Sequence, residues 1–277
     1  MFLNDLINKG TETNEGDYIK DGLIFCHWCD TPKQCEINFL GSKRIVACLC
    51  QHRMDEQAEQ EAEEKRIAHE KYIMRLRQEA FSSSMMIDWT FENSGDSKLI
   101  QIVKNYADNF KLMFEHGEGL LLYGDVGNGK TYAAACVVND LINKGVPCLM
   151  TNFARLINTL QGMYEGKQEY IDGLNNYKLL VIDDLGIERK TGFMDEQVFS
   201  ILDARYQSGL PLIITTNLTN DELKHPADRA KSRIYDRLLE RCHPVEVTGA
   251  SKRKANLKNN FQKIQDILEG KNEIHNT

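Results

Sequence analysis

The fold of this chain is decided by the stretch Gly124-Asp125-Val126-Gly127-Asn128-Gly129-Lys130-Thr131. It matches the phosphate-binding pattern G-x-x-x-x-G-K-[ST] at every fixed position. Glycines let successive backbone N–H groups turn toward an anion, and the positive end of a following helix attracts the same anion. We therefore expect the whole stretch, with Tyr132 after it, to bind a nucleotide. Lys130 should face the β- and γ-phosphates, and the Thr131 hydroxyl should hold Mg²⁺.

The residues on either side place this loop in an α/β domain. Residues 120–123 form a short apolar run, which predicts a buried parallel strand. Residues 132–142 are apolar on almost every side and stop before Gly145, as expected of a buried helix. Strand, loop and helix follow in the order that phosphate binding needs, which favours a nucleotide site over a simple glycine turn.

Two further apolar strands should bring polar side chains to the same edge of the sheet. Residues 179–182 end in Asp183 and Asp184, and residues 211–216 end in Asn217. Because the carboxyl ends of parallel strands share one edge, these groups should lie beside the phosphates. We expect Asp183 to hold Mg²⁺ and Asp184 to orient or deprotonate the attacking water. Asn217 should contact the γ-phosphate or that water, although such a residue by itself more often marks a turn.

Length and composition limit the remaining choices. The 277 residues suffice for one α/β domain and a smaller one beside it. A formal net charge of −7 and a pI of about 5.6 argue against a protein that coats nucleic acid by bulk electrostatics, while leaving room for a local site. No apolar run reaches the length of a membrane span, and the first residues lack a secretory signal pattern, so we expect a cytoplasmic protein.

Five of the eight cysteines fall between positions 26 and 50, which predicts a metal site in a small amino-terminal domain. A segment this short usually needs a bound metal or a cross-link to fold. Four thiolates can hold one zinc ion tetrahedrally. The expected ligands are Cys26, Cys29, Cys48 and Cys50. The alternative ligands are Cys35, His27 and His52, and unligated structural cysteines are the simpler alternative.

Residues 54–88 separate the two domains. They carry an acidic and then a basic run with only a thin apolar stripe, which predicts a solvated linker helix. A partner-binding helix is the alternative. The predicted domains are 1–53 (zinc-binding), 54–88 (linker), 89–250 (nucleotide-binding) and 251–277 (a basic, helical tail).

Four features of residues 89–250 occur together: the loop, the acid pair, the strand end Thr215-Thr216-Asn217, and the segment Ser-Arg-Ile-Tyr-Asp-Arg-Leu at 232–238. As a set they resemble AAA+ ATPases of the DnaC-like helicase-loader group, which includes the IstB-like transposase helpers and phage replication proteins. The resemblance implies a RecA-like parallel sheet without a full helical lid, and Mg²⁺-dependent hydrolysis of ATP to ADP. It also implies a sensor role for Asn217 and an Arg237 that enters a neighbouring subunit's site, with Arg233 as second candidate.

The same resemblance implies the partners. Members of this group place a hexameric replicative DNA helicase on single-stranded DNA, and their cysteine-bearing amino-terminal domains grip the helicase. It further implies head-to-tail self-association, and it places Tyr164 and Phe193 where aromatic side chains meet bases. Tyr164 also continues the apolar face of its helix, which favours core packing, so Phe193 is the preferred candidate for contact with bases. Two departures are Asp184, where most AAA+ proteins carry Glu, and the short sequence after Val247.

Other functions share part of this pattern. A transposase helper would use the same ATPase residues but bind duplex DNA and a transposase, and the expected zinc module favours the loader. A small-molecule kinase would use the loop and Mg²⁺, yet Asn217 and the late arginines fit hydrolysis across a subunit boundary better. A non-enzymatic adaptor would need a broken motif, and the motifs here are intact.

Overall fold

A computed structural model describes residues 13–81, 83–186, 192–226, 228–249, 261, 264–265 and 267–269, with the backbone alone for 192–195 and 229–230. By its internal contacts the chain divides into two compact units, Met1–Lys71 and Tyr72–Thr277. None of the described helices is long and apolar enough to cross a bilayer.

The first unit contains two short antiparallel hairpins. Each turns through two residues of positive φ, Asp21-Gly22 in one hairpin and Leu40-Gly41 in the other. Two-residue turns of this kind match the twist of the paired strands, and glycine adopts them without steric cost. The strands are β1 (Tyr18–Lys20) paired with β2 (Leu23–Phe25), and β3 (Gln34–Phe39) paired with β4 (Ser42–Ala47).

Polar contacts hold this unit together where little apolar surface is buried. The Asp17 carboxylate accepts hydrogen bonds from the backbone of Asn14 and His27 and pairs with the Lys33 ammonium. Burial alone would raise the pKa of this carboxyl, but the bonds from Lys33, Asn14 and His27 hold it far below its usual range. Asp17 therefore joins the first hairpin to the turn that carries Cys26.

Helix α2 (Gln51–Ala80) is continuous across the division between the units. Its buried residues are Leu76 and Ala80, both in the second unit. There the Tyr72 hydroxyl also donates to the Gly145 carbonyl oxygen at 3.5 Å. The first part of the helix is exposed, as expected of a solvated segment. The short 3₁₀ turn η1 (Ser84–Asp88) follows, and the predicted domain boundaries at 53 and 88 stay predictions.

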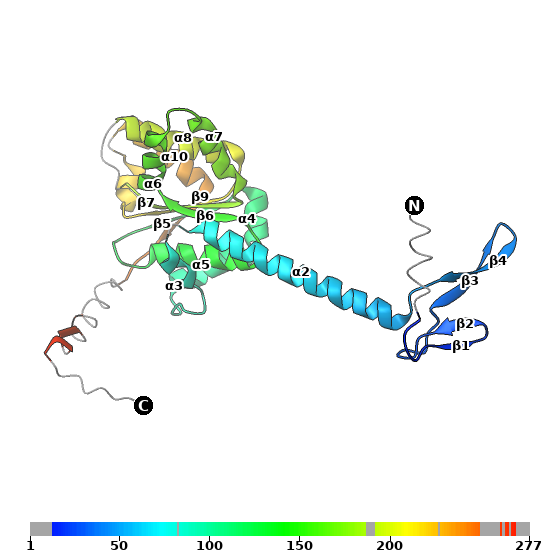
Figure 1. Cartoon of the computed structure of the whole chain (residues 1–277). Coiled ribbons are helices and arrows are strands. Elements are labelled where there is room, and N and C mark those ends of the chain that lie inside the picture. The colour runs from blue at the N-terminus through cyan, green and yellow to red at the C-terminus, as the bar shows by residue number, and fades with distance from the viewer. Residues whose placement is uncertain are drawn as a thin grey trace. The chain divides into compact units, whose positions relative to one another are not determined.

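The second unit is built on a five-stranded parallel sheet, which confirms the predicted α/β fold class (Figure 1). The middle strand, β8, lies between the strand that precedes the loop and the strand that carries the acid pair. All neighbouring strands run parallel, so their carboxyl ends share one edge. Across the sheet the strands are β6 (Cys148–Asn152), β7 (Leu179–Leu185), β8 (Leu212–Thr216), β5 (Gly119–Tyr123) and β9 (Cys242–Glu246).

Helices cover both faces of this sheet, which is why its central strands are apolar up to the polar residues at their carboxyl ends. Leu120 and Leu122 of β5 join one core cluster, and Leu121 and Tyr123 join the other, the alternation expected of a strand. On the first face lie α3 (Lys98–Asp108), α4 (Phe110–His116) and α5 (Lys130–Asn143). On the second lie α6 (Phe153–Gly162), α7 (Lys167–Gly173), η2 (Leu174–Asn176), α8 (Gly192–Ser208), α9 (Asn220–Lys224) and α10 (Arg229–Arg241).

One arginine is buried inside the second unit. Arg205, near the end of α8, is 1% exposed. Its guanidinium donates to the carbonyl oxygens of Pro211, Tyr177 and Lys178. These residues directly precede β8 and β7, so the arginine ties the starts of both strands to the helix. Burial lowers the pKa of Arg205 to about 10, which leaves it charged at neutral pH.

We expect Arg205→Ala to lower the free energy of unfolding by at least about 3 kcal/mol, because several buried carbonyl groups lose a charged donor. Arg205→Lys should recover only part of this, since one ammonium cannot reach all three carbonyls. Urea denaturation followed by circular dichroism measures the change. The control is Arg155→Ala on the exposed surface of α6, expected within about 0.5 kcal/mol of wild type. Equal stability of the Arg205 and Arg155 variants would contradict the prediction.

Candidate nucleotide-binding site

The predicted loop connects β5 to α5, and glycine is required at two of its positions. Gly124 has a φ of 128°, and a Cβ there would lie 2.6 Å from the Val247 carbonyl oxygen. Gly129 caps the start of α5 with a φ of 91°. Residues with side chains avoid this left-handed region. The glycines thus let the loop turn tightly against the chain that follows β9.

Two loop side chains bond to nearby backbone. The Lys130 ammonium donates to the carbonyl oxygens of Gly124 at 2.7 Å and Asp125 at 2.8 Å. The Asn128 amide donates to the Val247 carbonyl oxygen at 3.2 Å. The lysine is therefore held over the loop, and the loop is anchored to the end of the sheet.

Val126, Gly127 and Tyr132 are the remaining residues of the predicted nucleotide site. Val126 is 60% exposed, and Gly127 has a φ of 89°. Tyr132, predicted to contact the nucleotide, lies partly buried in the first turns of α5. Its hydroxyl donates to the Thr90 carbonyl oxygen at 3.3 Å, and its ring packs on that of Trp89. These contacts hold Tyr132 against the segment that precedes α3.

Thr131 and Asp183 come together from different elements. The Thr131 hydroxyl, in the first turn of α5, donates to Asp183 Oδ1 of β7 at 3.0 Å. Burial raises the pKa of the Asp183 carboxyl, while hydrogen bonds from Thr215 and Thr131 and the charge of Lys130 act in the opposite direction. Hydroxyl and carboxylate oxygens are the donors that Mg²⁺ prefers. The pair therefore fits the cation site predicted from the sequence.

Asp184 has an unusual backbone conformation, with a φ of 60°. A residue with a side chain in this region costs on the order of 1–3 kcal/mol, and such residues concentrate at active sites. The backbone N–H of Asp184 donates to Thr215 Oγ1 at 3.0 Å. The two consecutive acids thus differ in their settings. Asp183 is buried and bonded through its side chain, whereas Asp184 is half-buried and bonded through its backbone.

Asn217 directly follows β8 and is half-buried. Because β8 separates β7 from β5, Asn217 belongs to the same sheet edge as the acid pair and the loop. The structure therefore brings the loop, Thr131, Asp183, Asp184 and Asn217 to one edge of the sheet. Their individual roles stay predictions.

A cleft of about 640 Å³ opens beside the loop. It lies between the start of α3, where Ser97 and Ile102 line it, and the β9 segment with Pro244 and Val247. Asn128 of the loop forms part of its wall. This volume falls within the range of small-molecule binding sites.

Arg237 and Arg233 lie on α10, and the structure shows what they contact within the chain. Arg237 forms an ion pair with Asp203 of α8, and its guanidinium lies 4.5 Å from the centre of the Phe199 ring. Arg233 stacks on the same ring at 4.4 Å. Tyr206 completes this arrangement beside Arg237. Within the chain, Arg237 is thus held by Asp203 and by the Phe199 ring, and its predicted role at a neighbouring site stays a prediction.

The two aromatic residues considered for nucleic-acid contact differ in what the structure describes. The Tyr164 side chain, in the turn after α6, is fully exposed. The core-packing interpretation of Tyr164 is therefore wrong. The side chain of Phe193 lies outside the described residues.

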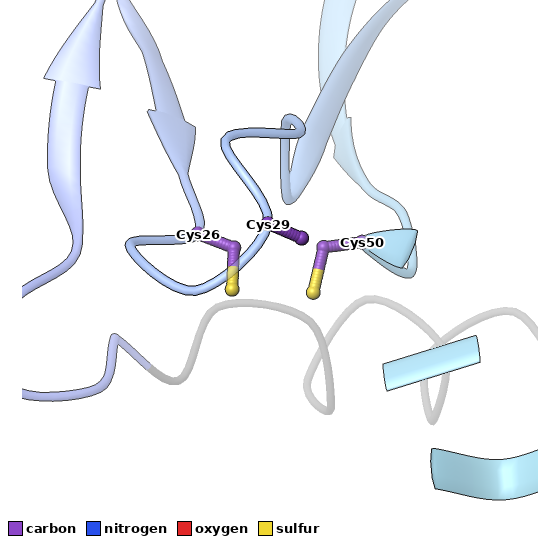
Figure 2. Close-up of side chains that lie close together, drawn as sticks. All are labelled: Cys26, Cys29 and Cys50. Atoms are coloured by element: carbon purple, nitrogen blue, oxygen red, sulfur yellow. The ribbon is translucent and has the colours of Figure 1, made fainter. Parts of the chain in front are cut away.

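Three of the predicted zinc ligands converge in the first unit (Figure 2). Cys26 follows β2, Cys29 ends the same turn, and Cys50 directly precedes α2. Their sulfur atoms lie within 4.8 Å of one another. Cys48 is not part of this group; its thiol donates to the Pro32 carbonyl oxygen at 3.4 Å. Three converging thiols fit part of a structural zinc site, which needs a fourth donor to be closed.

Donors around Cys29 favour its thiolate form. The Thr31 hydroxyl lies 3.0 Å from Cys29 Sγ, and the backbone N–H of His52 donates to the same sulfur at 3.4 Å. These bonds lower the pKa of Cys29 to about 6, and the bond from Thr31 contributes most. Burial acts in the opposite direction. Burial raises the pKa of Cys50. Of the alternative ligands, the His27 ring lies 3.4 Å from Asp17, and the His52 ring stacks on Trp28.

Thr215 contributes to the site, although the sequence pattern assigns it only to a strand end and predicts no role for it. Thr215 is fully buried, and its hydroxyl contacts both acids of β7. The available signal was that Thr215 and Thr216 are polar residues at the end of an otherwise apolar buried strand.

A parallel sheet with a glycine-rich loop after β5 and an acid pair at the end of β7 defines a P-loop ATP-binding domain of the AAA+ class. The chain belongs to the family described as IstB-like ATP binding protein, which matches residues 31–260. This confirms the resemblance drawn from the motifs.

Two related proteins and one solved structure show how far this likeness extends. The uncharacterized protein YqaM of Bacillus subtilis (strain 168) is 31% identical over 139 residues, which cover 48% of this chain and 44% of YqaM. The replicative helicase loader DnaI of the same organism is 22% identical over 244 residues, covering 82% of this chain and 78% of DnaI. A crystal structure of DnaI is 26% identical with a TM-score of 0.52, covering 62% of this chain and 95% of that one. The chain thus spans less than half of YqaM but most of DnaI.

We expect one zinc ion per chain in protein purified without chelators, since three thiols already converge and a thiolate cage stabilises a small unit strongly. Cys26→Ser should remove the zinc, as measured by elemental analysis. The control is Cys148→Ser, which changes a buried thiol in the second unit.

Full-length protein without zinc would contradict this prediction. Cys48→Ser then tests the fourth ligand: loss of zinc would assign Cys48 as the sequence predicts, and retention would exclude it.

Proposed function

We propose that this protein uses ATP to load a replicative DNA helicase onto single-stranded DNA. The supporting observation is an intact nucleotide site combined with a likeness to DnaI over 82% of the chain. The second unit alone holds less than that share of the residues, so the likeness extends into the cysteine-bearing unit.

The loop and the cleft support ATP as the nucleotide. Backbone N–H groups of the loop and the start of α5 bind the phosphates. Lys130 exchanges the carbonyl oxygens of Gly124 and Asp125 for oxygens of the β- and γ-phosphates. The base and ribose enter the cleft beside Asn128, whose volume is sufficient for them.

The edge of the sheet supports hydrolysis. Thr131 and Asp183 hold Mg²⁺, which neutralises charge on the phosphates. Asp184 orients the attacking water, and Asn217 contacts that water or the γ-phosphate. Lys130 is the cation that the loop itself supplies, and more charge develops on the γ-phosphoryl group during transfer. Arg237 of a neighbouring subunit supplies the further positive charge that stabilises this developing negative charge, in a head-to-tail assembly.

Exposed apolar side chains in the first unit support a protein partner. Ile19, Trp28 and Leu40 are 76%, 67% and 91% exposed. These three large side chains give the first unit exposed apolar surface that is available to a protein partner. We assign this surface to the hexameric helicase, and we assign the fully exposed Tyr164 to stacking on single-stranded DNA.

A transposase helper is the second candidate, favoured by the description of the family itself. It would use the same ATPase residues with duplex DNA and a transposase. Affinity capture with the full chain, followed by mass identification, separates the candidates. Recovery of a hexameric helicase, with binding to single strands in preference to duplex, supports the loader. Recovery of a transposase with preference for duplex DNA would replace it.

Lys130→Ala should weaken ATP binding, because it removes the positive charge that faces the β- and γ-phosphates. Asp184→Asn should spare binding and slow turnover, since Asn tolerates the left-handed conformation but cannot accept a proton from water. Binding of a fluorescent ATP analogue and release of phosphate measure the two effects separately.

The control is Asp172→Asn, which neutralises an exposed acid on α7 and should leave binding and turnover unchanged. Equal loss of binding in the Lys130 and Asp184 variants would mean that Asp184 holds the metal and that the two acids exchange roles.

Arg237→Ala should bind ATP normally but hydrolyse it about 10³–10⁵-fold more slowly, the usual effect of removing an arginine finger. Mixing it with Lys130→Ala should restore part of the turnover, because some interfaces then pair an intact loop with an intact arginine. Phosphate release measured across mixing ratios, with helicase and DNA present, gives the result.

Arg233→Ala serves as the comparison, since both arginines stack on Phe199. If mixing restores no turnover while both variants assemble, Arg237 does not act across the subunit boundary. Arg233 would take its place if its own variant behaves as expected of the finger.

A further inference from the structure

We propose that Thr215 is a positioning residue for ATP hydrolysis, whose single buried hydroxyl fixes both acidic residues of β7. This inference rests on the proposed ATPase activity and adds to it a residue that does not touch the nucleotide. Thr215 lies on the middle strand of the sheet and is 0% exposed.

The pairing of β7 with β8 places Thr215 opposite both acids. Ile182 pairs with Ile214, and the next pair is Leu185 with Thr216. Two residues of β7 therefore face the single residue Thr215, which is the arrangement of a β-bulge. A bulge interrupts the ladder of backbone hydrogen bonds, and at this point the Thr215 side chain takes over part of that ladder.

The Thr215 hydroxyl accepts one hydrogen bond and donates another. The Asp184 backbone N–H can only donate, so Thr215 Oγ1 accepts at this contact of 3.0 Å. The hydroxyl proton is then left for Oδ1 of Asp183, which it contacts closely. One oxygen thus holds the carboxylate that faces Thr131 and also the backbone that gives Asp184 its φ of 60°.

The next residue shows that this role is specific to Thr215. The Thr216 hydroxyl donates to the Leu185 carbonyl oxygen at 2.8 Å and accepts the Leu218 N–H at 3.1 Å. These bonds close the far side of the bulge and involve neither acid. On its other side β8 pairs Thr215 with Leu122 of β5, the strand that leads into the loop. Thr215 is therefore fixed relative to the loop and to the acids.

The experiment compares Thr215→Val, which keeps the shape but lacks the hydroxyl, with Thr215→Ser, which keeps the hydroxyl. Thr151→Val is the control, because it removes another buried threonine hydroxyl from β6, a strand that pairs with β7 and not with β8. A fluorescent ATP analogue gives the affinity without Mg²⁺, a Mg²⁺ titration of the same signal gives the metal requirement, and phosphate release gives kcat.

Thr215→Val should bind the analogue without Mg²⁺ as wild type does. Its half-saturating Mg²⁺ concentration should rise, and its kcat fall, by about 10–100-fold, the usual effect of losing a group that orients a metal ligand. Thr215→Ser should restore most of both quantities, and Thr151→Val should match wild type.

Unchanged Mg²⁺ requirement and kcat in Thr215→Val, with an active wild type, would overturn this inference and leave the proposed function intact. A wild type that neither binds nor hydrolyses ATP would overturn the proposed function itself. Thermal unfolding checks that the variants fold. If Thr215→Val does not fold, Thr215→Ala is compared with Thr215→Ser, since these two differ only in the hydroxyl. Failure of both Val and Ala to fold would show a structural role and overturn the inference.

Discussion

The Asp183 carboxyl group stands at the end of a strand that is buried on both faces, and the site depends on the groups that stabilise its charge there. Burial, and next to it the charge of Asp184, raise the pKa of Asp183, and hydroxyl groups from α5 and β8 together with the Lys130 ammonium offset part of that effect. These groups come from elements that meet because β8 lies between β7 and β5. The order of the strands is therefore what makes a charged group tolerable at this position.

Much of the nucleotide site could be predicted because its signals are local in the sequence. A glycine-rich loop between an apolar strand and an apolar helix fixes both the class of fold and the position of Lys130. The surroundings of Asp184 could not be predicted in the same way. They depend on a bulge and on Thr215, which lies 31 residues away on another strand. The contacts of Arg205 and of Arg237 likewise join segments whose register no local pattern reveals.

The cysteine group also shows that spacing along the chain does not fix which side chains meet in space. Spacing along the chain predicted a cluster, and Cys26, Cys29 and Cys50 do converge. Cys48 was predicted as the partner of Cys50, yet between the end of β4 and the start of α2 the chain is neither strand nor helix. A separation of two residues therefore carries no information about which side a thiol faces, and Cys48 bonds to Pro32 instead.

The carbonyl group of Val247 lies against two parts of the loop, since it leaves no room for a side chain at Gly124 and accepts a hydrogen bond from Asn128. A displacement of the loop by an entering phosphate would press directly on this peptide group. The loop and the residues that directly follow β9 therefore cannot move independently, because a shift at Gly124 or at Asn128 has to be matched by the Val247 peptide group.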